Sequence, residues 1–444
     1  MNLLKSGGQV NWRPIFFLLI TVCFSWLIGV PQVLMADDQA YSGWQSFQTE
    51  YTQIIFEPHN IAYAEDLAGF ADGLFEEVSE MVGWKPEKRV PVVLTDRTAL
   101  ANGFYRPLPH SITLFLTSPG DRFLGARSQN WLQSLYVHEL VHYIHLTERL
   151  GLPGLASYVF GPDAVAANTA LMPVWWIEGL AVWAESNLLA GGRGDSPVFN
   201  SLWQAPLMEG KMWSRKQMRY QSAYNPLGRV YVSGYLVVDY LVDRYGIEVF
   251  RQINKRFIWF PLLGIECAVK HVTGDSLRLA YMRMQGRKRF ELRERDFAGQ
   301  EGNALATQAG STHREWHVPY SAGDTLLTYS EGTHATAGFV DAKAPSVTLF
   351  ETGWLSDSLS YSFSRDGRRA VFARISGDYG HSSGTPNIIK GNSDIFLLDM
   401  TAGSYEYKKL THGQRLYQPS ISADGSVIVA IELEGDSYRL VKIE

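Results

Sequence analysis

The stretch HELVH, residues 138–142, carries the most chemistry in this sequence and indicates how the chain around it folds. Two histidines four positions apart lie one turn apart on the same face of an α-helix, so their rings can bind one metal ion. His138 and His142 would supply two protein ligands, and zinc accepts such a pair while keeping a position open for water. Glu139 is off the ligand spacing and would lie beside that water, as expected of a general base.

Apolar residues surround this motif and predict the helix that carries it. The helix is predicted over residues 131–150, where Gly151 and Pro153 stop it. A pair of core or surface histidines on an ordinary helix is the alternative interpretation. His145 lies on the same face, but seven residues of helix rise about 10 Å, so His138 and His145 cannot easily bind the same ion.

A second apolar helix, predicted over residues 173–189, offers a third ligand within the segment WWIEGLA, residues 175–181. Glu178 is a carboxylate between apolar neighbours, and burying it without a partner is costly, so a metal ion would be a suitable partner. The alternative is a glutamate on a helix surface. Glu185 follows seven residues later on the same face and could hold a zinc histidine, although a solvated glutamate near a helix end is an equal alternative.

A HELVH helix followed by a WWIEGLA helix resembles the gluzincin branch of metallopeptidases, the peptidase MA-like group. The resemblance covers about residues 50–260 and implies one zinc ion with Glu178 as its third protein ligand. Two features depart from the pattern of this group. The gap between His142 and Glu178 is longer than in the aminopeptidase-type members. Val182 stands where the thermolysin-type members carry an acidic residue.

A tyrosine is the candidate donor to the oxyanion that forms during hydrolysis. A third helix is predicted over residues 230–245 and closed by Gly246. Related proteins place a tyrosine in the turn before such a helix. Tyr231 matches that position best, and Tyr235, one turn later, is the alternative. Both could instead be packing tyrosines.

The residues before the motif predict a small mixed sheet. Strands are expected at residues 53–56, 90–94 and 111–117, and a helix with one apolar face at residues 61–82. Residues 113–116 are the expected edge on which an extended peptide would pair. With the helices that follow the motif, residues 37–300 are expected to form an α+β zincin-like metallopeptidase domain, made of a small mixed sheet and a helical subdomain.

The composition changes near residue 300, where glycine, serine and threonine become more frequent. The segments SFSRDG, residues 362–367, and SISADG, residues 420–425, each predict a strand, an Asp-Gly hairpin turn and a second strand. They resemble the propeller repeats of the TolB-like family. Residues 301–444 are therefore expected to be an all-β, propeller-blade-like region of about two to three blades. A propeller normally closes with about four to eight blades, so a truncated product, a gene fragment and a small open β domain are all possible.

The N-terminus predicts export. An apolar run at residues 15–30 is followed by Pro31 and the small residue Ala36, which is the order of a signal peptide over residues 1–36. Residues 14–36 carry no charge and could instead span a bilayer as an anchor. In either case the body of the chain is expected outside the cytoplasm, in the periplasm or cell envelope of a bacterium. A membrane partner is expected only if this segment is retained.

The composition argues against several other classes of protein. The net charge of −5 and the lack of a basic stripe give no sign of nucleic-acid binding. Cys23 lies in the predicted signal, so the mature chain keeps only Cys267 and forms no internal disulfide. No Gly-x-Ser-x-Gly elbow occurs, and Cys267 has only the isolated His271 nearby, which disfavours serine or cysteine hydrolysis.

Two functions remain as hypotheses. The first is a zinc-dependent peptidase for peptide or protein substrates, with Glu139 as general base and Tyr231 as oxyanion donor. The alternative is an envelope protein-interaction module, whose β-repeat region binds a protein partner and whose metal site is structural or vestigial. A fourth protein ligand, such as His145 or Glu185, would close a structural site, whereas a catalytic site leaves that position to water.

Overall fold

The chain divides into residues 1–44 and residues 45–444. The computed structural model describes residues 43–98, 101–117, 130–220, 228–294, 314–317, 326–331, 336–341, 348–353, 361–376, 392–400, 406–434 and 437–443. The predicted signal peptide or anchor lies outside these described residues. Within them, no single helix is long and apolar enough to cross a membrane, although one bent pair, Pro162–Leu171 with Val174–Leu188, has the length and composition to do so.

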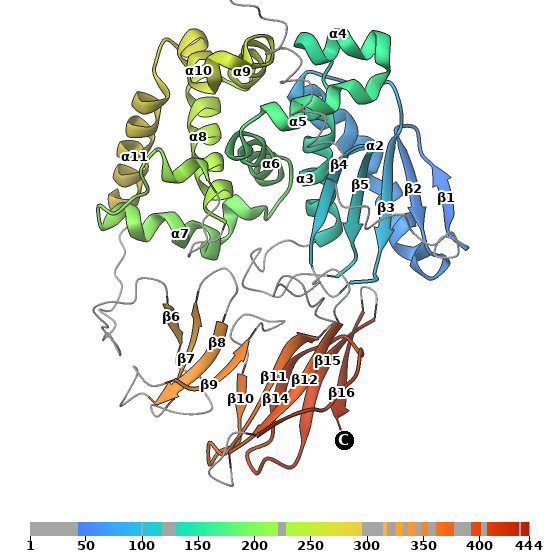
Figure 1. Ribbon diagram of the computed structural model, residues 1–444, viewed down its shortest axis with the longest axis vertical. Helices are drawn as coiled ribbons and strands as arrows, with labels where there is room; N and C mark the ends of the chain where they lie inside the picture. The colour runs from blue at the N-terminus through green and yellow to red at the C-terminus, as the bar shows by residue number, and fades with distance from the viewer. Residues whose placement is uncertain are drawn as a thin grey trace, which may run out of the picture. The chain divides into compact units, whose positions relative to one another are not determined.

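A five-stranded mixed sheet opens the described part of the chain (Figure 1). Its strands are β1 (Gln45–Gln48), β2 (Thr52–Phe56), β3 (Val90–Thr95), β4 (Gly103–Pro107) and β5 (His110–Phe115). They lie in the order β1-β2-β3-β5-β4, with β2, β3 and β5 parallel and the two outer strands antiparallel. Alternate residues of β3 are buried, as expected of a strand. Helix α2 (Ile61–Val82) connects β2 to β3 and covers the sheet with its apolar face. The predicted mixed sheet is confirmed.

The expected edge strand was wrong. Residues 113–116 lie in or next to β5, which hydrogen-bonds β3 on one side and β4 on the other. The outer strand next to β5 is β4, with the sequence GFYRP. Its glycine, arginine and proline break the alternation of apolar and polar residues that identifies strands, so the sequence pattern did not reveal it.

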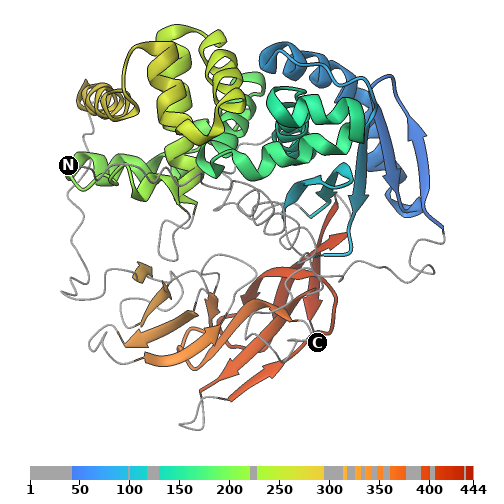
Figure 2. The same cartoon turned by 45° about the horizontal axis from the view of Figure 1, so that its top comes forward.

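The remainder of this region is helical (Figures 1 and 2). Its α-helices are α3 (Trp131–Leu146), α4 (Gly151–Phe160), α5 (Ala167–Leu171), α6 (Val174–Leu188), α7 (Pro197–Met208), α8 (Arg229–Tyr245), α9 (Glu248–Trp259), α10 (Gly264–Thr273) and α11 (Leu277–Glu294). Its 3₁₀ helices are η2 (Pro58–Asn60), η3 (Pro162–Ala166), η4 (Arg193–Asp195), η5 (Gln217–Arg219) and η6 (Pro261–Leu263). One apolar cluster, from Ile54 to Leu292, joins the sheet and the helices.

The helix that carries the HELVH motif is shorter than the sequence predicts. It ends at Leu146, and the Thr147 hydroxyl donates a hydrogen bond of 2.7 Å to the carbonyl of Tyr143. Gly151 and Pro153 begin α4 instead of stopping α3. Proline fits the first turn of a helix, where its missing N–H group has no intrahelical partner to lose. Glycine and proline close together therefore indicate a helix boundary, but they do not distinguish the end of one helix from the start of the next.

Helices α6 and α8 touch backbone to backbone. A Cβ atom on Gly179 of α6 would lie 2.5 Å from the carbonyl carbon of Gly234 on α8, and a Cβ on Gly234 would clash with the carbonyl oxygen of Trp175. Only glycine allows this approach. Because Glu178 precedes Gly179, and Tyr231 lies one turn before Gly234, the contact also sets the positions of these two side chains.

Antiparallel sheets make up the described C-terminal region. Two are four-stranded and one is three-stranded. The strands are β6 (Arg314–His317), β7 (Leu326–Glu331), β8 (Thr336–Asp341), β9 (Thr348–Gly353), β10 (Tyr361–Phe363), β11 (Arg369–Ser376), β12 (Asn392–Asp399), β13 (Glu406–Lys409), β14 (Leu416–Ile421), β15 (Ile428–Glu434) and β16 (Ser437–Ile443). The two predicted Asp-Gly turns are confirmed, with Gly367 at φ +67° and Gly425 at φ +73°. The all-β region is as expected, while its propeller arrangement and the domain boundaries remain predictions.

We expect Gly179→Ala to destabilise the protein by about 1–3 kcal/mol, because the added methyl group forces α6 away from α8. The measurement is the free energy of unfolding in urea. Gly73→Ala is the matched control, since Gly73 lies on the exposed side of α2 and a Cβ there meets no atom within 4 Å. The control should leave stability unchanged or raise it by up to about 1 kcal/mol. Equal stability of the two variants would contradict the backbone contact.

Candidate metal centre

Helices α3 and α6 bring the three predicted ligands together. Nε2 of His138 lies 3.1 Å from Nε2 of His142 and 3.2 Å from Oε2 of Glu178. Nε2 of His142 lies 3.3 Å from the same carboxylate oxygen. Around an ion with tetrahedral bonds of about 2.0–2.1 Å, neighbouring ligand atoms are about 3.3 Å apart. Both the donor types and their spacing therefore fit one metal ion.

The motif residues are shielded from solvent by the elements packed around α3. His138, Glu139 and His142 are 5%, 5% and 7% exposed, and α3 is buried on nearly every side. Burial raises the pKa of Glu178, but His142 and His138 outweigh this effect and hold it well below its usual range. The site thus combines an ionised carboxylate with two imidazoles in surroundings where an unpaired charge would be costly.

Glu185 lies behind His138, where the sequence suggested a partner for a histidine ligand. Its Oε2 is 3.2 Å from Nδ1 of His138. Burial raises the pKa of Glu185, but Arg193 and His138 lower it to about 2, so the carboxylate is ionised. An ionised carboxylate accepts a hydrogen bond from Nδ1–H and thereby leaves the Nε2 lone pair free for a metal.

Arg193, in η4, is a site residue that the sequence pattern did not reveal. Its Nε lies 2.5 Å from Oε1 of Glu185 and its Nη2 lies 3.0 Å from Oε2, which makes a two-pronged ion pair. The same Nη2 lies 2.5 Å from Nδ1 of His138; both groups are donors when Nδ1 carries hydrogen, so they share Glu185 as acceptor and form no hydrogen bond with each other. No spacing in the sequence marks this arginine, because it reaches Glu185 only after the chain turns back at Gly191 and Gly192.

Without a metal, the imidazole of His138 is protonated on both nitrogens near neutral pH and is positively charged. Burial and Arg193 lower its pKa, but the hydrogen bonds to Glu178 and Glu185 outweigh them and raise it to about 9. A metal ion and a proton compete for the same nitrogen, so metal binding near neutral pH must release the proton.

Tyr231 lies near the donor group, as we call the three candidate metal ligands His138, His142 and Glu178. Its ring centroid is 6.4 Å from that of His138, and the guanidinium of Arg193 lies 5.4 Å from its ring centre. Burial, Glu178 and Glu139 raise the pKa of Tyr231 above its usual value, although Arg193 opposes them. The phenol therefore keeps its proton at neutral pH and can donate a hydrogen bond.

Tyr235, the alternative to Tyr231, packs elsewhere on α8. Its ring lies 5.8 Å from that of Phe199 on α7. Its hydroxyl lies close enough to Gly194 that a Cβ there would be 2.6 Å away. One turn of helix thus separates a tyrosine at the donor group from a packing tyrosine.

His145 does not join the donor group. Its Nε2 lies 2.9 Å from Oδ1 of Asn254, whose Nδ2 lies 2.9 Å from Oε2 of Glu148. Burial lowers the pKa of His145 to about 4, so its ring is neutral and links α3 to α9. Among the described residues, the donor group has three members, and neither His145 nor Glu185 closes it.

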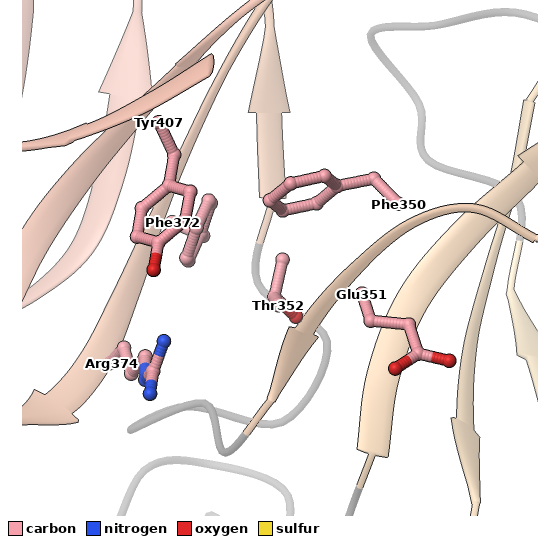
Figure 3. A pocket seen from close by; sticks show the side chains of 6 residues that line it. All are labelled: Phe350, Glu351, Thr352, Phe372, Arg374 and Tyr407. Carbon is pink, nitrogen blue, oxygen red and sulfur yellow. The ribbon is translucent and has the colours of Figure 1, made fainter. Parts of the chain in front are cut away.

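Two other features of the described residues lie apart from this group. Glu57, His59 and Asp96 could also approach one ion, but His59 is exposed and such groups are common on surfaces. A pocket in the β region is lined by side chains of β9, β11 and β13 (Figure 3). Its lining residues are Phe350, Glu351, Thr352, Phe372, Arg374 and Tyr407. It contains none of the predicted site residues.

No protein-family model matches this sequence. An "Uncharacterized protein" of Treponema pallidum (strain Nichols) is 26% identical over 430 residues, which cover 86% of this chain and 37% of that protein. The chain thus spans little more than a third of the length of this relative.

Two solved structures are similar to part of the chain. A TolB from Agrobacterium tumefaciens is 17% identical over 27% of this chain and 39% of its own, with a TM-score of 0.19. TolB from Acinetobacter baumannii is 14% identical over 27% and 38%, with a TM-score of 0.14. Scores this low establish neither the fold nor a function. The metallopeptidase resemblance of the sequence remains a prediction.

We expect the purified wild-type chain to bind about one metal ion and Glu178→Ala to lose it. Glu185→Gln should keep the ion but bind it about 10–100-fold more weakly, because His138 loses its ionised partner. Metal content by mass spectrometry and affinity by chelator competition are the measurements. His271→Ala, an exposed histidine on α10, is the control and should behave as wild type. Full metal content in Glu178→Ala would remove Glu178 from the site.

Glu148 predicts a pH dependence of stability. Burial raises its pKa from 4.5 to about 7, although Asn254 and two cations lower it. The folded state then holds a proton that the unfolded state has released. Glu148 should therefore lower the free energy of unfolding between pH 4.5 and pH 7 by up to about 1.4 kcal/mol per pH unit, whereas His145 raises it between about pH 4 and pH 6.5 because its folded-state pKa is lowered.

The variant Glu148→Gln should lose the contribution of Glu148, because its amide is neutral throughout, so its stability should rise more steeply with pH than that of the wild type. Urea unfolding of the metal-free protein over this pH range is the measurement. Glu80→Gln, on the exposed side of α2, is the control. If Glu148→Gln keeps the wild-type slope, another group is responsible.

Proposed function

We propose that this chain is a zinc-dependent peptidase that acts outside the cytoplasm. The observation that carries the proposal is the triangle of His138, His142 and Glu178 donor atoms, with the buried Glu139 next to His138 in the same helix. Two histidines and one carboxylate are a donor set that catalytic zinc sites use, with a further position left to water or substrate. Three donors within the described residues favour this function over a closed structural site.

His138, His142 and Glu178 would hold the ion, and Glu185 with Arg193 would keep the His138 ring in place. Zinc, when bound, would polarise the scissile carbonyl and lower the pKa of water to about 7. Glu139 would take the proton of the attacking water and pass it to the leaving amine.

Tyr231 would donate its phenolic hydrogen to the oxygen that becomes negative during attack. One feature supports this role over a purely structural one. Both Glu178 and Glu139 act electrostatically on Tyr231, whereas neither acts on Tyr235. Tyr231 thus lies near the ligand carboxylate and the general base at once.

Substrate would bind along the outer strand β4. A Cβ on Gly103 of this strand would lie 3.0 Å from the side chain of Leu135, which is one helical turn before Glu139 on α3. An extended peptide pairing with β4 would therefore run close to the motif helix. Main-chain pairing of this kind recognises peptides without reading much of their sequence, so the proposed substrates are extended peptide segments.

The rest of the chain fits an exported protein in this proposal. Residues 1–36 would direct export or anchor the chain, and residues 37–300 would form the peptidase domain. Residues 301–444 would add a partial propeller that binds a protein partner. The periplasm or cell envelope of a bacterium is the proposed location.

Glu139→Gln should bind metal as wild type does but hydrolyse peptides at least about 100-fold more slowly, because glutamine cannot accept the proton. Tyr231→Phe should lower kcat by about 100–1,000-fold with less effect on KM, and Tyr235→Phe is its matched control. The assay is cleavage of a quenched-fluorescent peptide library with metal content measured in parallel. Wild-type rates in metal-loaded Glu139→Gln would overturn the mechanism.

A further inference from the structure

The metal centre does not explain an exposed apolar surface on α4 and the turn after α9. We call it the apolar ridge, formed by Leu152, Leu155, Val159, Phe160, Phe260 and Leu262. Phe160 is 81% exposed and Leu262 is 99% exposed. Soluble proteins rarely gather so many large apolar side chains on one surface unless it contacts another molecule or a membrane.

The two parts of the ridge are neighbours in space. A Cβ on Gly151, the first residue of α4, would lie 2.5 Å from the carbonyl oxygen of Ile258 near the end of α9. Figure 1 shows α4 and α9 at the same end of the helical region. The ridge is therefore one surface made by two elements, and not a set of scattered residues.

The shape of the ridge favours insertion into the apolar layer of a lipid bilayer over binding in the groove of another protein. Helix α4 buries only Gly151, Gly154 and Ser157, so it rests on its small residues and directs its large ones outwards. A Cβ on Gly154 would be 2.6 Å from the carbonyl oxygen of Arg149, so this side of the helix packs closely on the turn that precedes it. A projecting helix of this kind can enter the acyl region of a lipid surface over much of its circumference.

Cations lie at the borders of the ridge. The guanidinium of Arg256 lies 4.0 Å from the ring centre of Phe260, and that of Arg149 lies 5.6 Å from the ring centre of Tyr158. Lys255 is exposed next to Arg256. Arg149 also forms an ion pair with the exposed Glu87, at 3.5 Å. Anionic lipid headgroups attract basic side chains. Aromatic side chains favour the layer just below the headgroups.

We infer that the apolar ridge inserts into the surface of a lipid bilayer, with Arg149, Lys255 and Arg256 at the level of the headgroup phosphates. This inference goes beyond the proposed peptidase function and does not depend on it. The ridge would hold the body of the protein against a membrane whether or not residues 14–36 remain attached.

A fluorescent label on the ridge tests insertion locally. Val159→Cys is introduced into the full chain with Cys23→Ser and Cys267→Ser, and the thiol carries an environment-sensitive dye. On adding vesicles of phosphatidylcholine and phosphatidylglycerol, we expect the emission to shift to the blue and to rise at least about twofold. Met282→Cys on α11, at 58% exposure, is the matched control and should not respond. Because the dye reports its own surroundings, attachment through the N-terminal segment cannot mimic this result.

Binding of the chain to vesicles tests the contribution of the ridge. Phe160→Ser with Leu262→Ser should weaken binding at least about tenfold, because two large apolar side chains no longer leave water. Met282→Ser with Phe290→Ser removes two exposed apolar side chains from α11 and should bind as wild type. Since all four residues are exposed, each variant should keep its fold, which circular dichroism checks.

Three outcomes would overturn the inference. In the first, the chain floats with vesicles while the dye at position 159 does not respond. In the second, the ridge variant binds vesicles as wild type but changes from dimer to monomer by light scattering, which would make the ridge a contact between two copies. In the third, neither the labelled nor the unlabelled chain binds the anionic vesicles.

Discussion

The contact between Gly179 and Gly234 is the constraint on which the candidate site depends. It lets α6 and α8 approach until their backbones touch, and it does so next to Glu178 and one turn from Tyr231. Helix α6 also packs against α3, so the position of Glu178 relative to His138 and His142 follows from one tight arrangement of three helices. A larger residue at either glycine would separate the helices and thereby displace Glu178 and Tyr231.

Burial sets the second constraint. Helix α3 is apolar and covered on almost all sides, yet it carries two histidines and a glutamate. Such groups need partners in surroundings of low polarity. The partners come from α6 and from η4: Glu178 faces both rings, and Glu185 with Arg193 lies behind His138. Low polarity makes these groups costly to bury when one partner is missing. It would also strengthen the electrostatic attraction between the ligands and a metal ion.

Local patterns predicted well what depends on local geometry. Helix α2 was predicted with its observed bounds, because its apolar residues recur with a helical period over six turns. The Asp-Gly turns were predicted for a similar reason, since glycine permits the positive φ that such turns require. Strand β4 was missed because an outer strand buries little and its sequence need not alternate. The end of α3 was misjudged because glycine and proline serve equally well at the end of one helix and the start of the next.

The sequence by itself determined the pairing of His138 with His142, because four residues of helix always place two side chains on one face. It also marked Glu178 as a carboxylate in need of a partner. Only the tertiary structure placed the ring of Tyr231 near His138 and that of Tyr235 against Phe199, turned His145 towards Asn254, and brought Arg193 to Glu185. These outcomes depend on which segments meet when the chain folds back on itself. Contacts between distant segments leave no periodic trace in a single sequence, whereas contacts within one helix do.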